Sequence, residues 1–243
     1  KYILIESVQR RSLERFAIND MNINISNIDN FKNQILNNQK NDNLIQSHSN
    51  EQFEINWIDV FNSIFSKSNN NDVSVINNLN LNAFIYNAKF KIKGHGKMAP
   101  HVYRELLNKD FFSTEVSRDL LFYDEDLKYL KYESEENIKL LNNNFNLLAK
   151  ALGEKNIKLI FMPAVDKYNL YSPYIISNTY QKSIFFEYLD SLPKDYIFIN
   201  TKKILSEQLE KGEKDIFYAD DTHWSHKASE VIIKDESFKI IFN

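Results

Sequence analysis

Cysteine is absent from the 243-residue sequence. Without thiols the chain has neither a disulfide framework nor a thiolate metal site. A protein without cysteine suits either side of a membrane, so cysteine usage does not indicate the compartment.

Glycine and proline are scarce, with four residues of each. Two of the glycines lie in GHGKMAPH, residues 94–101, which we predict to be a loop. The segment holds His95 and His101 beside Lys97, and its glycines would let backbone amides face an anion. It lacks the Gly-x-x-x-x-Gly-Lys-Ser/Thr spacing of a phosphate-binding loop. We therefore interpret it as a flexible loop of an insertion; the alternative is a lid or an acceptor-binding element.

Neither charge nor hydrophobicity is concentrated in one part of the chain. The 30 basic and 33 acidic residues leave a formal charge of -3, which argues against an electrostatic nucleic-acid binder. No apolar run approaches the roughly 18 residues that cross a bilayer. Any membrane anchor is therefore expected outside this sequence.

The residues that are present favour a folded domain. Apolar residues make up 43% of the chain and aromatic residues 14%, enough for the core of one large domain or of one domain with an insertion. The first residue is lysine, and Tyr2–Ile5 already has the pattern of a buried strand. We therefore expect the polypeptide to be cut from a longer one.

Helical and strand patterns alternate in the second half of the chain. An amphipathic helix from Glu135 is predicted to stop at Gly153, and the strand Lys158–Met162 follows. A helix over Ser183–Leu192 and a strand over Tyr196–Asn200 repeat this order. The pattern predicts an α/β fold with a parallel sheet, in which the carboxyl ends of the strands carry the site.

The segment FYADDTHWSHKAS, residues 217–229, concentrates chemically active side chains after the last of these strands. Asp221 and His223 lie two residues apart, so the carboxylate can fix the imidazole tautomer and support its charged form, as in the base half of a nucleophile–base–orienter arrangement. Ser225 can cap the following helix, and Trp224 offers an apolar plate beside the histidine.

Spacing alone leaves other interpretations of this segment open. Asp220 and Asp221 can be turn and cap residues, with His223 an ordinary surface histidine. Asp220 can replace Asp221 as the orienting carboxylate. Both carboxylates with His223 and His226 can also form a site for zinc or a hard cation, although no spaced ligand elsewhere supports it.

The tetrapeptide Asp221-Thr222-His223-Trp224 resembles the signature of the AlgJ/AlgX-like alginate O-acetyltransferases, a branch of the SGNH hydrolase superfamily. Upstream, IKLIFMPAVDKYNLYSP resembles the strand of that family followed by proline, lysine and tyrosine, here Pro163, Lys167 and Tyr171. The linked pattern spans about residues 120–235. The resemblance implies an SGNH-like three-layer α/β sandwich with a central, mostly parallel sheet, formed by residues 1–20 and 111–243, and a helical or loop insertion at 21–110.

By resemblance, His223 is the general base and Asp221 its orienting acid in a Ser-His-Asp triad. In ordinary SGNH enzymes the carboxylate stands three residues before the histidine, which is Asp220 here, but the tetrapeptide favours Asp221. The nucleophile departs from the superfamily pattern, because no glycine precedes a serine in a Gly-x-Ser or Gly-Asp-Ser turn. Since the Asp-x-His motif lies near the end of the chain, we expect the serine upstream of Lys1 and the domain to be incomplete.

The resemblance predicts an O-acyltransferase, with acetyl the expected group, that modifies a cell-envelope or extracellular polysaccharide through an acyl-enzyme. It also predicts an extracytoplasmic location, an acetyl donor and a membrane partner that delivers acetyl groups, without metal, cofactor or nucleic acid. Two alternatives stay open. One is an inactive glycan-binding or scaffold module with the SGNH fold, and the other is a carbohydrate acetylesterase.

Further residues are candidates for substrate binding. By resemblance these are Trp224, Lys167, Tyr171 and Arg10, with Glu6 and Gln9 at the mouth of the pocket, although Glu6 and Arg10 also suit solvated positions. An aromatic set has the spacing of helix and core packing more than that of a sugar-stacking platform, namely Phe111, Phe112, Phe122, Tyr123, Tyr129 and Tyr132.

Overall fold

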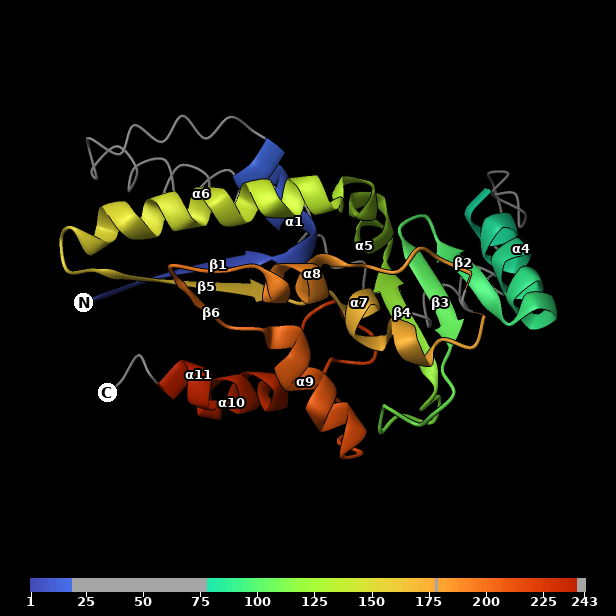
Figure 1. Cartoon of the computed structure of the whole chain (residues 1–243). Coiled ribbons are helices and arrows are strands. Elements are labelled where there is room, and N and C mark those ends of the chain that lie inside the picture. Colours follow the sequence, from blue (N-terminus) through green and yellow to red (C-terminus); the bar gives the residue numbers. More distant parts are fainter. Residues whose placement is uncertain (19–77, 178, 240–243) are drawn as a thin grey trace, which may run out of the picture. The chain divides into compact units, whose positions relative to one another are not determined.

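The computed structural model describes residues 1–18, 78–177 and 179–239 (Figure 1). The chain divides into two compact units, Lys1–Met21 with Ala83–Asn243, and Asn22–Asn82. Nearly all of the described residues belong to the first unit. The larger part of the predicted insertion, residues 21–110, lies outside the described residues, whereas 83–110 fall within the first unit, and the predicted domain boundaries stay a prediction.

A three-stranded parallel sheet forms the centre of the first unit (Figure 1). Its strands are β1 (Tyr2–Val8), β5 (Lys158–Ala164) and β6 (Ile197–Phe198), in the order β1-β5-β6. Tyr2 pairs with Lys158 and Val8 with Ala164, so the carboxyl ends of the two long strands coincide. The prediction of an α/β fold with a parallel sheet is confirmed.

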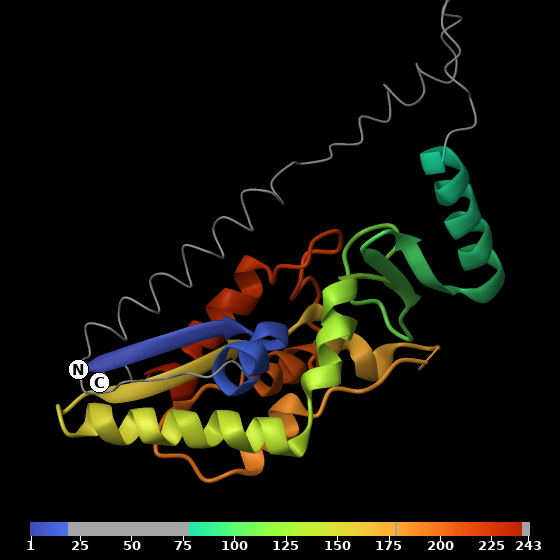
Figure 2. The same ribbon diagram turned by 90° about the horizontal axis from the view of Figure 1, so that it is seen from above.

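Helices cover both faces of this sheet (Figure 1). On one face lies α6 (Glu135–Gly153), which begins after the capping residue Ser134 and runs along the strands (Figures 1 and 2). Its apolar residues recur at helical spacing and are buried: Ile138, Leu141, Phe145, Leu148 and Leu152. On the other face lie α9 (Thr201–Glu210) and α10 (His226–Lys234), as Figure 1 shows. The arrangement gives three layers.

Aromatic rings fill the core between α6 and the sheet. The ring of Phe161 on β5 lies 4.2 Å from that of Phe145 on α6 and 6.1 Å from that of Phe16. Tyr196 closes the cluster at 5.4 Å from Phe145, and its hydroxyl donates to Asn142. These offset and edge-on contacts fix α6 against β5.

A second sheet replaces the loop that we predicted at residues 94–101. It is antiparallel, with strands β2 (His95–Ala99), β3 (Val102–Leu106) and β4 (Asp119–Tyr123) in that order. The loop prediction is therefore wrong. Its glycines had suggested a turn, but Gly94 and Gly96, at φ of 71° and 124°, adopt backbone conformations that glycine tolerates, while the segment pairs with β3.

The remaining helical elements complete the described part of the chain. They are α1 (Gln9–Leu13), the π-helix η1 (Glu14–Ile18), α4 (Asn78–Lys93), α5 (Asp124–Lys128), η2 (Tyr129–Tyr132), α7 (Lys167–Tyr171), η3 (Ser172–Tyr174), α8 (Phe185–Ser191) and α11 (Glu236–Lys239). Three helices begin within three residues of the carboxyl end of a parallel strand: α1 after β1, α7 after β5 and α9 after β6. This edge of the sheet brings polar side chains from distant parts of the chain together.

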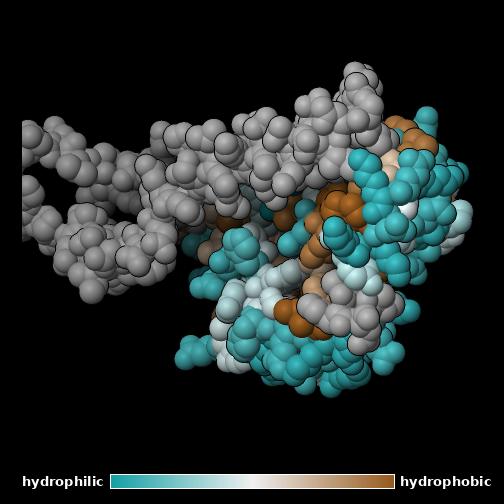
Figure 3. Space-filling model, turned by 90° about the vertical axis from the view of Figure 1, so that its left-hand side faces the viewer, coloured by the Kyte–Doolittle hydropathy of each residue, from teal (hydrophilic) through white to brown (hydrophobic). Residues whose placement is uncertain are grey.

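Some large apolar side chains remain exposed, among them Leu4 and Val8 on β1, Leu147 on α6 and Ile233 on α10. The face in Figure 3 likewise shows hydrophobic residues between hydrophilic ones. None of the helices in the described part of the chain has the length and hydropathy needed to cross a bilayer.

Candidate active site

The motif segment forms a closed loop in front of α10. Phe217 and Trp224 form an antiparallel bridge, and the Tyr218 amide donates to the His223 carbonyl at 3.2 Å. At the base of the loop, the Ser225 amide donates to the Ile216 carbonyl at 2.8 Å. Residues 218–223 are therefore held at both ends by backbone hydrogen bonds.

Ser225 joins the loop to the helix. It is the N-cap of α10: its Oγ accepts from the Lys227 amide at 3.2 Å and donates to the Asp215 carbonyl at 2.5 Å. The side chain is buried, as a cap between two packed segments should be. The predicted capping role of Ser225 agrees with this geometry.

We expect Ser225→Ala to lower the free energy of unfolding by about 1 kcal/mol, because the cap of α10 and the bond to Asp215 are both lost. For a chain of this size, that corresponds to a fall in Tm of roughly 2–4 °C in a thermal melt. Ser229→Ala is the control, since the Ser229 hydroxyl makes only a long bond of 3.5 Å to the Ser225 carbonyl. Equal melting shifts in the two variants would contradict the assignment of the cap.

Asp221 and His223 form a hydrogen-bonded pair at the tip of the loop. Their atoms Oδ1 and Nδ1 lie 2.7 Å apart, and the same oxygen accepts from the amides of Thr222 at 2.5 Å and His223 at 3.2 Å. Partial burial on its own would raise the pKa of Asp221, but the bonds from the His223 ring and from the two amides lower it overall. The carboxylate therefore stays ionised beside the imidazole.

The second ring nitrogen of His223 is available for chemistry. The carboxylate assigns the proton to Nδ1, which leaves Nε2 as the acceptor. The side chain of His223 is 74% exposed, and among the described residues nothing hydrogen-bonds to Nε2. A hydroxyl that reaches this position can transfer its proton to the ring.

Asp220 is exposed, and within the described structure it makes no hydrogen bond to this imidazole.

Lys167 lies beneath the loop, at the start of α7 and three residues after the end of β5. Its Nζ donates to the carbonyls of Tyr218, Ala219 and Asp221 at 2.6, 3.0 and 2.9 Å. The side chain is 1% exposed, and burial lowers its pKa to about 8, although Asp220, Asp221 and Asp126 act in the opposite direction. All three ammonium protons are thus directed to carbonyls of the loop, and the substrate-binding role of Lys167 stays a prediction.

Arg10, at the start of α1, also turns inward. Its Nη1 lies 2.7 Å from Asp166 Oδ1 and 3.3 Å from Asp126 Oδ1, and its Nε lies 3.6 Å from Glu125 Oε2. Asp126 and Asp166 are 3% and 5% exposed. The predicted substrate-binding arginine thus neutralises two buried carboxyl groups at the carboxyl edge of the sheet.

Burial raises the pKa of both Asp126 and Asp166, with mutual repulsion adding to the effect at Asp126 and Arg10 opposing it. Above an ordinary pKa near 4, the folded state then binds more protons than the unfolded state. Stability must therefore fall as pH rises from about 4 through the raised pKa values. We expect urea titrations at about pH 5 and about pH 7 to show this loss in the wild type, and a smaller loss in Asp126→Asn. If the free energy of unfolding fell by the same amount between the two pH values in both proteins, the raised pKa of Asp126 would be contradicted.

The other predicted substrate-binding residues differ in accessibility. Tyr171 is 0% exposed, with its ring 5.4 Å from Phe111, 5.5 Å from Phe112 and 6.1 Å from Phe217, so it packs behind the loop. Trp224 is half-buried next to the His223–Asp221 pair in sequence. Among the aromatic set, Phe111, Phe112 and Phe122 are buried and belong to the core. At the end of β1, Glu6 is exposed and Gln9 is buried.

In the part of the chain that the structure describes, no serine hydroxyl hydrogen-bonds to His223. Ser7 stands at the carboxyl end of β1, the edge that also carries Lys167. It is 4% exposed, and its Oγ donates to the Val8 carbonyl at 3.3 Å and accepts from Arg15 Nη1 at 3.4 Å. The described residues thus show the base and the orienting acid of a triad without a serine in contact.

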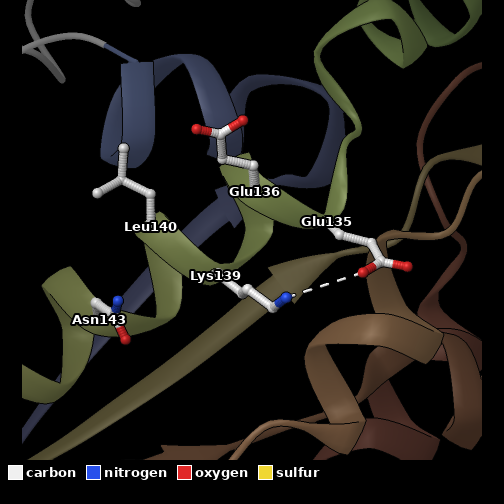
Figure 4. Close-up of a pocket in the computed structure, with 5 residues that line it drawn as sticks. All are labelled: Glu135, Glu136, Lys139, Leu140 and Asn143. Carbon is white, nitrogen blue, oxygen red and sulfur yellow. Dashed lines mark ion pairs between the residues drawn. The ribbon is translucent and has the colours of Figure 1, made fainter.

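Two other features lie outside this constellation. Within residues 1–18, 78–177 and 179–239, no group of three or more His, Asp or Glu side chains is placed to hold a metal ion, and this includes the alternative cluster around Asp220 and His226. Figure 4 shows a surface depression on α6, lined by Glu135, Glu136, Lys139, Leu140 and Asn143. Glu135 and Lys139 form an ion pair at 3.8 Å there.

Residues 117–234 match a family model described as an SGNH hydrolase-like domain of the acetyltransferase AlgX. Searches of curated proteins and of solved structures gave no match. The matched segment runs from just before β4 to the end of α10, about half of the chain, and includes Lys167, Asp221 and His223. β1 and Arg10 lie outside it. The predicted resemblance is confirmed over this segment.

Proposed function

Because residues 117–234 match the family model of an SGNH hydrolase-like domain of the acetyltransferase AlgX, we propose that this protein is an O-acetyltransferase that uses His223 as its general base. The proposed acceptor is a hydroxyl of a cell-envelope or extracellular polysaccharide. The observation that carries the proposal is the 2.7 Å pair of Asp221 and His223, whose Nε2 stays open to an incoming hydroxyl.

The proposed reaction has two balanced steps. In the first, a serine hydroxyl gives its proton to His223 Nε2 and attacks the acetyl carbonyl of the donor, and the donor's oxygen leaves with that proton. In the second, a sugar hydroxyl gives its proton to Nε2, attacks the serine ester and takes the acetyl group, while the serine recovers its proton. Asp221 stabilises the imidazolium that forms in each step.

Two positions for the nucleophilic serine are distinguishable. One is Ser7, which lies at the carboxyl edge of the sheet but points toward Arg15 in this structure, so it would have to change rotamer. The other is a serine upstream of Lys1, as the order of motifs in ordinary SGNH enzymes implies. Support for the base and acid does not depend on this choice, because it rests on the loop geometry.

The location and partners are also proposals. The family description supports acetyl transfer. We propose the envelope polysaccharide and the extracytoplasmic location from the resemblance of the Asp221–Trp224 motif alone. A membrane protein that delivers acetyl groups is the proposed partner. Asp220 is not assigned a part in the reaction, because the geometry pairs His223 with Asp221.

Acceptor competition with the full-length protein tests the proposal. The protein is incubated with p-nitrophenyl acetate and a deacetylated oligosaccharide, and both O-acetyl sugar and free acetate are quantified. We expect acetyl to appear on the sugar at the expense of acetate. Acetate release that is independent of the acceptor would make the protein an esterase.

An inactive glycan-binding module is a second candidate, favoured by the lack of a described serine in contact with His223. Neither acetylated sugar nor free acetate, together with saturable oligosaccharide binding in calorimetry, would support this module and contradict the transferase.

A further inference from the structure

We propose that Lys167 is a positioning residue, whose buried ammonium group holds the Asp221–His223 loop in the geometry that the base needs. This inference rests on the proposed function for its catalytic meaning. The structural part stands on the three hydrogen bonds from Nζ to the carbonyls of residues 218, 219 and 221.

The loop has few other means of holding its shape. The backbone bonds close its base, namely the Phe217–Trp224 bridge and the bonds Tyr218–His223 and Ser225–Ile216. Toward the tip, Asp221 binds the amides of Thr222 and His223 and the His223 ring, all of them immediate neighbours. The carbonyls of residues 218, 219 and 221 converge on one point, where their partial negative charges repel each other. An ammonium group has three donors and no acceptor, so it can satisfy all three carbonyls at once.

The carbonyls of the loop point inward to Lys167, whereas the side chains of Asp221 and His223 point outward to solvent. The side chains of Asp221 and His223 are 51% and 74% exposed, whereas Lys167 is 1% exposed. The carbonyl of Asp221 binds the lysine while its carboxylate binds the imidazole. Asp221 is thus held by Lys167 through its backbone and orients His223 through its side chain.

Lys167 is itself fixed to the sheet. It is the first residue of α7, three residues after the end of β5, and the adjacent Asp166 is bound by Arg10 at 2.7 Å. The Val165 amide donates to Thr201 Oγ1 at 3.1 Å, and that hydroxyl donates to the Pro163 carbonyl at 2.5 Å. The ammonium nitrogen also lies over the ring of Phe112, 5.2 Å from its centre. These bonds fix the position of Lys167 relative to the end of β5, and Lys167 in turn fixes the position of the loop.

Lys167→Met is the decisive variant, because it keeps the apolar stem and removes the cation. Its matched control is Lys227→Met, which removes a second lysine of the same motif whose Nζ donates to one carbonyl only, that of Lys214 at 2.9 Å, at the exposed surface. Hydrogen exchange is measured on the amides of residues 218–223 and of α6 in both variants. We expect faster exchange in the loop of Lys167→Met alone, with α6 unchanged.

Kinetics separate positioning from general stability. If the loop loses its alignment, kcat falls by about 10²-fold while KM stays close to the wild-type value. In Lys167→Ala, added n-butylammonium can occupy the vacated channel, and we expect it to restore part of kcat and of loop protection. A lysine that contributed only to folding would lower the yield or Tm, and a small ammonium ion would restore neither quantity.

The outcomes are distinguishable from failure of the proposed function. If the wild type transfers no acetyl group, the function is wrong, yet the exchange measurement still decides whether Lys167 holds the loop. Loop exchange equal to that of the wild type in folded Lys167→Met would overturn the inference. If the variants do not fold, ¹⁵N spectra of the wild-type ammonium decide: a slowly exchanging Lys167 signal coupled to three carbonyls supports the inference, and its absence overturns it.

Discussion

Replacing His223 by alanine should reduce acetyl transfer by about 10³-fold or more, because the reaction loses the group that accepts the proton from each attacking hydroxyl. The side chain is 74% exposed and, among the residues that the structure describes, hydrogen-bonds only to Asp221, so the fold should not suffer. Transfer is measured as initial rate at saturating donor, and folding by circular dichroism and thermal melting.

The natural control for this variant is His226→Ala. His226 belongs to the same motif but is the exposed first residue of α10, away from the pair of Asp221 and His223. We expect wild-type transfer in this variant. A His223→Ala protein that keeps its rate would remove His223 from the mechanism, and equal losses in both variants would point to damage of α10 instead of loss of a base.

Replacing Arg10 by methionine should lower the free energy of unfolding by about 3 kcal/mol at neutral pH, because two buried carboxyl groups lose their shared cation. Asp126 and Asp166 are 3% and 5% exposed and have no room to hydrate. Protonation relieves part of this cost, since burial raises the pKa of both groups, so the loss should shrink toward acidic pH. Urea titration gives the free energy, with the slope m as the check on two-state unfolding.

Arg11→Met is the matched control for this second variant. Arg11 pairs with Glu14 at 2.9 Å and with Glu125 at 3.5 Å, and the three side chains are each about 30% exposed. Partly exposed pairs of this kind contribute less than about 1 kcal/mol. The second change Asp126→Asn in Arg10→Met should recover part of the lost stability. If Arg10→Met were as mild as Arg11→Met, the buried carboxyl pair would not need the arginine.

The repeated α/β pattern was predictable because its signals are local. The amphipathic spacing of α6, the stop at Gly153 and the apolar run of β5 each occupy one short window of sequence. The ends were less accurate: the predicted strand Tyr196–Asn200 shortens to β6, Ile197–Phe198, since only Ile160 and Phe161 of β5 pair with it. Pairing across strands, which sets such ends, has no local signature.

The second sheet and the roles of two cations were not predictable in the same way. Glycine in β2 indicated a loop, and only the pairing with β3 overrides that preference. The family resemblance implied substrate contact for Lys167 and Arg10, and residue types such as these are seldom fully buried. The inward orientation of Lys167 depends on loop carbonyls 51 to 54 residues away in the sequence. That of Arg10 depends on carboxyl groups 116 and 156 residues away. The pair of Asp221 and His223 was predictable because both of its members lie within three residues.

The central claim is that Asp221 and His223 activate a serine for covalent acyl transfer, and labelling with a serine-directed fluorophosphonate tests it most directly. The full-length protein and its His223→Ala variant are treated, digested, and sequenced by mass spectrometry. We expect one labelled serine, Ser7 or a serine outside residues 1–243, whose label disappears in His223→Ala. An unlabelled wild-type protein, or a label that persists without His223, would contradict it.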